Sequence, residues 1–242
     1  MRSEAWLAET AYPGRGIVIG ASEDGALALQ IYWTMGRSGK SRNRVMVATG
    51  PDEVRTELAA PDPDVGDTSM ILYRAMARVG GFDVVSNGDQ TEALLTGLGG
   101  GASFADLCQL MEVEPDPPNY TSRISGVLDW RQRRYQLGAV RTPSNDVGDQ
   151  VAHTAAYRAL LPGVGHCITT YSGDGNPLPA FAGEPFTVAL GADPERDADR
   201  YWSLLDHDNR VALAIKAVSL TTGEGSIHLI NAREQTARAE TG

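Results

Sequence analysis

Residues 31–46 read IYWTMGRSGKSRNRVM, two apolar runs joined by a turn rich in Gly and Ser. The runs, residues 31–33 and 45–48, have the composition of short buried strands. The turn carries four cations within eight residues and no acid, although the formal net charge of the chain is -10. These cations are Arg37, Lys40, Arg42 and Arg44. Such a concentration predicts a site for a compact anion, phosphate above all, but a solvated basic turn would explain the charges equally well.

The turn also contains Gly39-Lys40-Ser41, which matches the end of a phosphate-binding P-loop. That motif requires a glycine five residues before Gly39, and position 34 is Thr34. We also expect a strand to follow the turn, whereas a P-loop needs a helix whose N-terminus cradles the phosphate. The sequence therefore excludes a P-loop.

The composition predicts a soluble globular protein. Of its 242 residues, 42% are hydrophobic and 21% charged, which is enough for a sizeable core. A pI near 4.8 argues against nucleic acid or an anionic membrane as partner. Two cysteines without a CxxC pair, and four histidines without ligand spacing, indicate neither a disulfide framework nor a metal site. We expect a cytoplasmic protein with no metal or redox cofactor.

Short apolar runs separated by turn residues dominate the chain and pair as hairpins. Helical patterns come in blocks, which favours largely antiparallel sheets with helices outside them, an α+β fold. We expect one domain over residues 1–232 and a C-terminal tail over 233–242. Residues 51–53 are interpreted as a loop or short helix, 61–64 as loop, and 69–76 and 149–160 as either strand or helix. The predicted hairpins span residues 16–33, 123–141 and 211–231, and the predicted helices span 90–98, 103–111 and 193–205.

Several separated segments together resemble the archaeal-type IMP cyclohydrolase family and its bacterial relatives. No segment is specific by itself, and the resemblance rests on their order along the chain. The segments are YPGRG at 12–16, Tyr32, RS at 37–38, RNR at 42–44, VVSNGDQT at 84–91, NYTSRI at 119–124, LGAVR at 137–141 and TTY at 169–171.

The resemblance implies the ring closure of 5-formamidoimidazole-4-carboxamide ribotide (FAICAR) to inosine monophosphate, at the end of purine biosynthesis. It implies a fold similar to that of N-terminal nucleophile hydrolases, a four-layered αββα sandwich of two antiparallel sheets between helices. It also makes a homo-oligomer reasonable, and the reaction requires no cofactor. The chain opens with Met1-Arg2, and no Ser, Thr or Cys follows a plausible processing site, so we do not expect a terminal-nucleophile amidase mechanism.

The resemblance also proposes a site, in which guanidinium groups suit phosphate or an oxyanion because their planar fork binds oxygens in pairs. The predicted catalytic residues are Arg42, Asn87, Glu114, Tyr120 and Arg123. The predicted substrate-binding residues are Arg15, Tyr32, Arg37, Ser38, Asn43, Arg44, Gly88, Asp89 and Tyr171.

Each assignment has a structural alternative. Ser38 and Asn43 could simply hold the turn, Asp89 could cap the following helix, and tyrosines in strands are often core. Asp116 competes with Glu114 as the acid-base group, and both could belong to a solvated loop. Two other functions remain open: a paralogue that closes a related nucleotide-like substrate in specialised metabolism, and a non-catalytic module that binds purine nucleotides.

Overall fold

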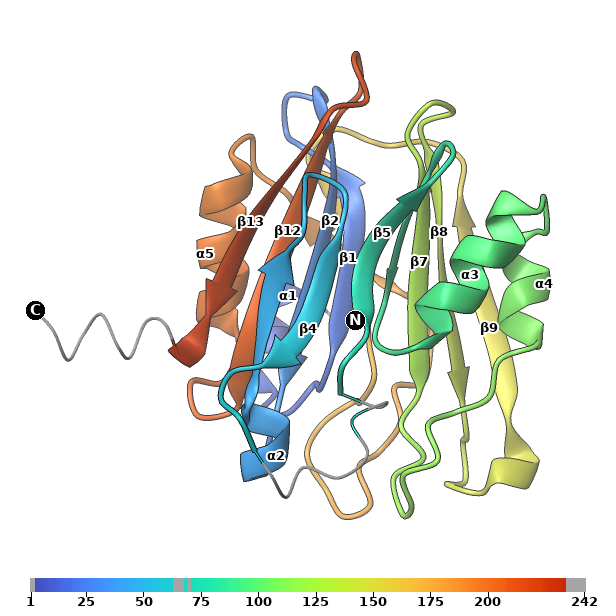
Figure 1. Cartoon of the computed structure of the whole chain (residues 1–242), viewed down its shortest axis with the longest axis vertical. Helices are drawn as coiled ribbons and strands as arrows, with labels where there is room; N and C mark the ends of the chain where they lie inside the picture. The colour runs from blue at the N-terminus through green and yellow to red at the C-terminus, as the bar shows by residue number, and fades with distance from the viewer. Residues whose placement is uncertain (1–2, 63–67, 69–70, 234–242) are drawn as a thin grey trace, which may run out of the picture.

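The computed structural model describes residues 3–62, 68 and 71–233 and shows two antiparallel sheets packed face to face (Figure 1). The six-stranded sheet has the order β11 (Phe186–Ala189), β10 (Val164–Thr169), β1 (Gly16–Ala21), β2 (Leu27–Met35), β12 (Arg210–Ser219), β13 (Gly225–Asn231). The seven-stranded sheet has the order β3 (Arg44–Ala48), β4 (Val54–Leu58), β5 (Arg74–Val79), β6 (Phe82–Ser86), β7 (Arg123–Asp129), β8 (Arg134–Arg141), β9 (Val151–Tyr157).

Helices cover the outer faces of both sheets. α3 (Gln90–Gly99) packs on β5 and β6, and α4 (Phe104–Gln109) packs on β8 and β9. On the opposite side, α5 (Pro194–Leu204) packs on β12 and β13, with α1 (Glu4–Glu9) beside it (Figure 1). The predicted α+β sandwich of antiparallel sheets is confirmed. No helix of the described residues is long and apolar enough to cross a membrane.

The strands β1 and β2 form the centre of the core. All six residues of β1 are buried, and so are all of β2 except its first residue. Continuous apolar runs of this kind suit strands that are covered on both faces. Trp33 stacks on Tyr201 of α5 at a centroid distance of 6.5 Å. A Cβ at Gly16 would lie 1.9 Å from the Trp33 ring, so this indole requires glycine at the adjacent position of β1.

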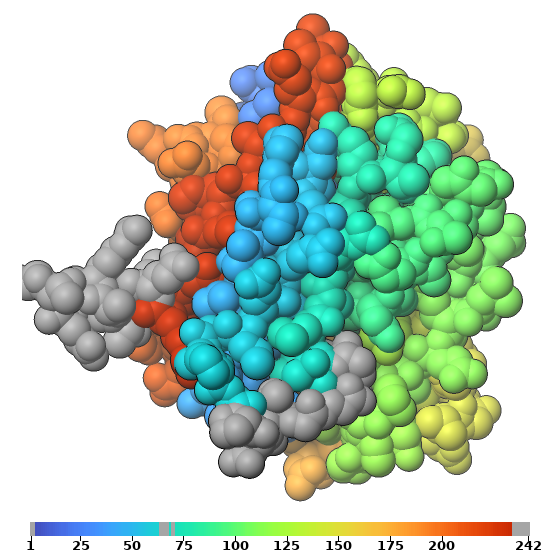
Figure 2. Space-filling model, viewed as in Figure 1, coloured from blue at the N-terminus to red at the C-terminus, as the bar shows by residue number. Residues whose placement is uncertain are grey.

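The two sheets contact each other through several strand pairs. β1 packs on β7 and β8, and both β12 and β13 pack on β3. Figure 2 shows the surface along this second contact, where β13 lies beside the segment that contains β3 and β4. A buried ion pair also joins the sheets, with Lys216 Nζ of β12 lying 2.6 Å from Asp83 Oδ1 of β6.

Most predicted elements are confirmed. The three predicted hairpins form β1–β2, β7–β8 and β12–β13. The three predicted helices are α3, α4 and α5, and Ser103 caps α4 by accepting a hydrogen bond from the Asp106 backbone N–H. The ambiguous segment 149–160 forms the strand β9, after a short 3-10 helix η1 (Val147–Asp149).

Some elements differ from expectation. No sequence pattern predicts α1, and β4 forms after residues 51–53, where the sequence predicts no strand. The strand expected after the basic turn is confirmed as β3, but a helix that was not expected, α2 (Gly39–Arg42), forms within the turn. This helix has only four residues, and Thr34 still excludes a P-loop. Residues 63–64 of the expected loop, residues 69–70 and the tail from residue 234 lie outside the described residues.

The basic turn connects the two sheets. β2 lies inside the six-stranded sheet, whereas β3 is the first strand of the seven-stranded sheet. Residues 36–43 therefore cross from one sheet to the other at the edge where α2 is found (Figure 1).

Candidate functional site

The predicted site residues lie where strands from both sheets begin or end. Neighbouring antiparallel strands alternate in direction, so the beginnings of β1, β5 and β7 share one edge of the sandwich with the ends of β2, β6 and β10. This edge is the lower one in Figure 1, near α2. The fold thus brings together side chains that are more than a hundred residues apart in the sequence.

A buried carboxylate between two arginines forms the centre of the site. Arg15 precedes β1 and places Nη2 3.3 Å from Oε2 of Glu114. Arg123 begins β7 and places Nη1 3.7 Å from Oε1 of the same carboxylate. The Glu114 side chain is only 2% exposed, and burial raises its pKa despite the opposing effect of the two guanidiniums. A buried carboxyl group with a raised pKa is a candidate for general acid-base catalysis.

Glu114 reaches this position because its loop is anchored to the protein. The Glu114 N–H donates to the carbonyl oxygen of Thr121 at 2.9 Å. Asp116 is occupied elsewhere, since it accepts hydrogen bonds from the Thr121 N–H and hydroxyl, each at 2.6 Å. Of the two candidate acids, the structure brings Glu114 and not Asp116 between the arginines.

Arg123 is held by α3 and by the loop before it. Its Nη1 lies 2.9 Å from Asp89 Oδ1 and donates to Gln90 Oε1 at 3.0 Å. Asp89 makes no side-chain cap bond to α3, so the capping alternative does not describe its contact. A Cβ on Gly88 would lie 2.0 Å from Arg123 Nη1. Glycine at this position therefore permits the close approach of the guanidinium.

Asn87 is bonded entirely within the protein. Its Oδ1 accepts from the Ile124 N–H and from Gln90 Nε2, both at 2.8 Å, and its Nδ2 donates to the Ser122 carbonyl at 2.9 Å. These bonds join the end of β6 to the beginning of β7. Because Asn87 bonds to the Gln90 amide, it also fixes the Gln90 side chain, whose oxygen accepts a hydrogen bond from Arg123.

Tyrosines from both sheets surround Arg15. The Tyr32 hydroxyl of β2 lies 2.6 Å from that of Tyr73, which precedes β5. The Tyr171 hydroxyl contacts that of Thr121. Burial raises the pKa of both Tyr32 and Tyr171, so these phenols are neutral hydrogen-bonding groups. Sequence reasoning missed Tyr73, because it lies in a segment whose secondary structure was ambiguous and carries no motif.

Several buried polar atoms here have no hydrogen-bond partner among the described residues. They are Arg15 Nε, Arg44 Nη1, Glu114 Oε1 and Ser122 Oγ. Buried polar groups in native proteins are nearly always paired, and leaving one unpaired costs about 1–3 kcal/mol. Further atoms of this kind occur elsewhere in the described residues, but these four lie around one buried carboxylate, which suits a site that is completed by a polar ligand.

The cations of the basic turn point in different directions. Arg44 is 2% exposed, donates to the carbonyl oxygens of Ser41 and Met35, and lies close enough to Tyr32 and Glu114 to lower the pKa of each. Arg42 is exposed and bonds to the Gly36 carbonyl. The structure thus brings Arg44 to the buried cluster, whereas the bonds of Arg42 are to the loop itself and to residue 209.

Arg37 lies at the rim of the site. Its Nη1 is 2.6 Å from Asp174 Oδ1, and its guanidinium carbon lies 5.0 Å above the centre of the Tyr12 ring. Tyr12 in turn stacks on Tyr171 at 5.9 Å. Arg37 is therefore linked to the buried cluster through two stacked rings.

Two predicted ligand donors hold local structure. Ser38 forms a capping box with Ser41 at the start of α2. Asn43 accepts from the Ala60 N–H at 3.0 Å and donates to the Ala60 carbonyl at 2.9 Å. Both polar groups of this amide are therefore engaged with the backbone after β4.

Tyr120 lies on the Glu114 loop in an unusual backbone conformation. Its φ is 42°, in the left-handed region that non-glycine residues rarely adopt. The residue is half-buried, and its N–H donates to the Asp116 carbonyl at 3.3 Å. Strained positions of this kind are concentrated at functional sites.

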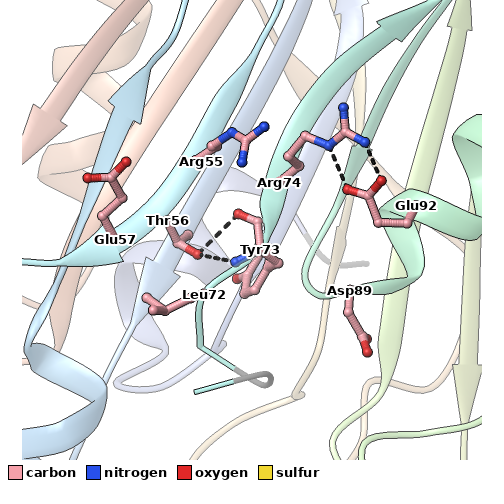
Figure 3. Close-up of a pocket in the computed structure, with 8 residues that line it drawn as sticks. All are labelled: Arg55, Thr56, Glu57, Leu72, Tyr73, Arg74, Asp89 and Glu92. Atoms are coloured by element: carbon pink, nitrogen blue, oxygen red, sulfur yellow. Dashed lines mark hydrogen bonds and ion pairs between the residues drawn. The ribbon is translucent and has the colours of Figure 1, made fainter. Parts of the chain in front are cut away.

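A cavity of about 340 Å³ adjoins the buried cluster. β4, the beginning of β5 and the beginning of α3 line it (Figure 3). Two of its lining residues also belong to the cluster, since Tyr73 contacts Tyr32 and Asp89 pairs with Arg123. In Figure 3, Arg74 and Glu92 are joined on one side of this cavity. The cavity has the size of a small-molecule site.

The fold and the site together define an α+β sandwich with a site of arginines, tyrosines and one buried carboxylate at the edge where both sheets meet. Over the part of the chain that the structure describes, no group of three or more His, Cys, Asp or Glu is placed to hold a metal ion. A family model described as IMP cyclohydrolase-like protein matches residues 12–223. The chain belongs to this family. A comparison with curated proteins finds no match.

Proposed function

We propose that the protein is an IMP cyclohydrolase, which closes the ring of FAICAR to give inosine monophosphate in purine biosynthesis. Family membership supports the reaction class. The observation that carries the proposal is the set of buried atoms without a hydrogen-bond partner, namely the donors Arg15 Nε and Arg44 Nη1 and the acceptor Glu114 Oε1. Such a set suits a neutral heterocyclic amide that bears an anionic group.

In this reaction the carboxamide nitrogen attacks the formyl carbon, and the resulting hydroxyl leaves as water. Both groups are on one imidazole, so the protein must hold the formamide in the reactive rotamer, stabilise the oxyanion and move protons. Orientation alone can supply several kcal/mol. Each well-placed donor to the oxyanion contributes about 3 kcal/mol.

We assign the proton transfers to Glu114. The carboxylate takes a proton from the attacking amide nitrogen and delivers it to the formyl oxygen. It then takes the formamide N–H proton and delivers it to the hydroxyl, so that the C–O bond breaks, water leaves and the ring C=N bond forms. A raised pKa suits a carboxyl group that both accepts and donates protons. Arg15 and Arg123 flank this carboxylate and donate to the oxyanion. The Tyr32–Tyr73 hydroxyl pair orients the carboxamide.

Arg44 from inside, with Arg37 and Arg42 at the rim, attracts the phosphate group. Tyr120 contacts the base from the Glu114 loop. Asn87, Gly88 and Gln90 act indirectly, because they hold Arg123 in place.

We extend the proposal to the setting of the reaction. The protein functions in the cytoplasm, as one domain over residues 1–232, with the fold of the N-terminal nucleophile hydrolases. The arrangement of helices outside two antiparallel sheets supports this fold.

The test follows inosine monophosphate formation from FAICAR by the purified protein. The Glu114→Gln variant is expected to lose about 10²–10⁴-fold in kcat, the usual contribution of a general acid-base group. The matched control is Glu112→Gln, an exposed acid two residues earlier, whose kcat should be unchanged. Equal rates for wild type and Glu114→Gln would refute the assignment.

A wild-type protein that produces no inosine monophosphate is then examined by calorimetry with that nucleotide. Binding without turnover would favour a nucleotide-binding module. Neither binding nor turnover would favour a paralogue with a different substrate.

A further inference from the structure

The large apolar side chains that are exposed in the described chain belong to segments next to β9 or to its first residue. Four large apolar side chains stand out from the protein: Leu110 (81% exposed), Val147 (49%), Val151 (37%) and Leu161 (57%). Leu110 ends α4, which packs on β9, and Val147 lies in η1 just before β9. Val151 is the first residue of β9, and Leu161 follows its end by four residues. Single exposed apolar residues are ordinary, and these four show that apolar side chains flank both ends of β9.

The strand β9 also presents an open backbone edge. It is the last strand of its sheet and pairs with β8 alone (Figure 1). Within the described ranges, the backbone of residues 151–157 makes no hydrogen bond to any segment other than β8. Unpaired edges of this length readily pair with another strand.

Two other edge strands are covered by side chains. On β3, Asn231 accepts from the Met46 N–H at 2.8 Å and donates to its carbonyl at 3.1 Å. On β11, Glu4 accepts from the Ala189 N–H at 2.7 Å, and Arg200 donates to its carbonyl at the same distance. In the part of the chain that the structure describes, no side chain bonds to the β9 backbone in this way, and the seven residues of β9 include neither proline, lysine nor a carboxylate.

We propose that β9 pairs with β9 of a second copy of this chain, antiparallel about a twofold axis at Thr154. The two seven-stranded sheets then form one continuous sheet, with both α4 helices on the same side. In this register, a residue that lies before Thr154 pairs with the residue of the second copy that lies the same number of positions after Thr154. It sets Val151 against Tyr157 of the second copy and Ala152 against Ala156.

The charges at the ends of β9 favour this partner and this direction. Asp149 lies just before the strand and Arg158 just after it. In the antiparallel pair, Arg158 of each copy lies beside Gln150 and next to Asp149 of the other, so opposite charges meet at both ends. A parallel pair would bring like charges together. The strand is thus complementary to itself.

The test uses Thr154, which lies on the proposed twofold axis and therefore pairs with Thr154 of the second copy. Thr154→Lys sets two lysines opposite each other, and Thr154→Glu sets two glutamates. Each variant should dissociate about fivefold more readily than wild type, because like charges directly opposite destabilise a strand pair by about 1 kcal/mol. Mixing the two variants should restore association through the Lys–Glu heterodimer. Sedimentation equilibrium over the micromolar range measures the association of wild type, of each variant and of the mixture.

The matched control is Thr187→Lys, an exposed position on the covered edge strand β11, which should associate as wild type does. Circular dichroism melting establishes that each variant is folded. If Thr154→Lys is not folded, the exposed Ala156→Lys mixed with Ala152→Glu tests the same register. A monomeric wild type, association unaffected by either charge, or variants that do not recombine would each overturn the proposal.

Discussion

Replacing Arg15 with Met should destabilise the protein in a pH-dependent way. Arg15 is the nearer of the two cations that flank Glu114, at 3.3 Å compared with 3.7 Å for Arg123. In the variant, the carboxyl group of Glu114, which is 2% exposed, keeps only the more distant guanidinium of Arg123 as an ion-pair partner. Removing one member of a buried ion pair costs about 3–5 kcal/mol. Since Arg123 remains, we expect about 3 kcal/mol at pH 8.

The loss should shrink in acid. Burial already raises the folded-state pKa of Glu114, and removing Arg15 raises this pKa further. Above the unfolded-state pKa of about 4.3, the folded protein then holds more protons than the unfolded chain, so its stability falls as pH rises toward the shifted pKa. Relative to pH 8, the loss at pH 5 should be smaller by about 1.4 kcal/mol for each pH unit, within this range, by which removing Arg15 raises the folded-state pKa of Glu114.

Urea unfolding of the variant and of wild type, at pH 5 and pH 8, measures this difference directly. The control is the double variant Arg15→Met/Glu114→Gln, which removes both charges and should recover most of the stability. Equal losses at the two pH values, or a double variant less stable than the single one, would refute the description of this pair as buried charges.

Three further predictions concern other parts of the chain. Gly88→Ala places a Cβ 2.0 Å from Arg123 Nη1, so kcat/KM for inosine monophosphate formation should fall at least about tenfold, as measured by initial rates. Asn43→Ala removes two hydrogen bonds of 2.9 and 3.0 Å to the loop after β4 and should lower the unfolding free energy in urea by about 1–3 kcal/mol. Burial raises the pKa of Cys108 to about 12 and that of Cys167 well above its ordinary value, so neither thiol should react with Ellman's reagent at pH 8 before unfolding.

Hairpins were predictable because their signals are local. The turn at residues 23–25 and the apolar runs around it suffice to predict β1 and β2. β4 has alternating charged residues in a five-residue strand and no preceding turn motif, so nothing local distinguishes it from loop. Residues 149–160 contain small residues that are compatible with the periodicity of a helix or of a strand. Only the pairing with β8 makes residues 151–157 a strand.

The candidate site was predictable only where a motif marked it. Arg15 and Arg123 belong to segments of the family resemblance, whereas Glu114 was one of two candidate acids in a loop without a motif. Residue spacing gives no indication that Glu114 lies between the two arginines. Tyr73 carries no local signal, because its role depends on the packing of β5 against β2 across the sandwich. Asn43 shows the opposite case, in which a residue inside a motif is occupied by backbone bonds that no sequence pattern reveals.

The division of the site between the two sheets has a consequence for ligand-linked stability. Arg15 and Tyr32 come from the six-stranded sheet, whereas Arg123 and Tyr73 come from the seven-stranded sheet. A ligand that bonds to both groups binds only when the sheets are packed together, so its binding free energy adds to the stability of the whole sandwich. Hydrogen exchange should then slow in β1 and β7 together on ligand binding, even though these strands belong to different sheets.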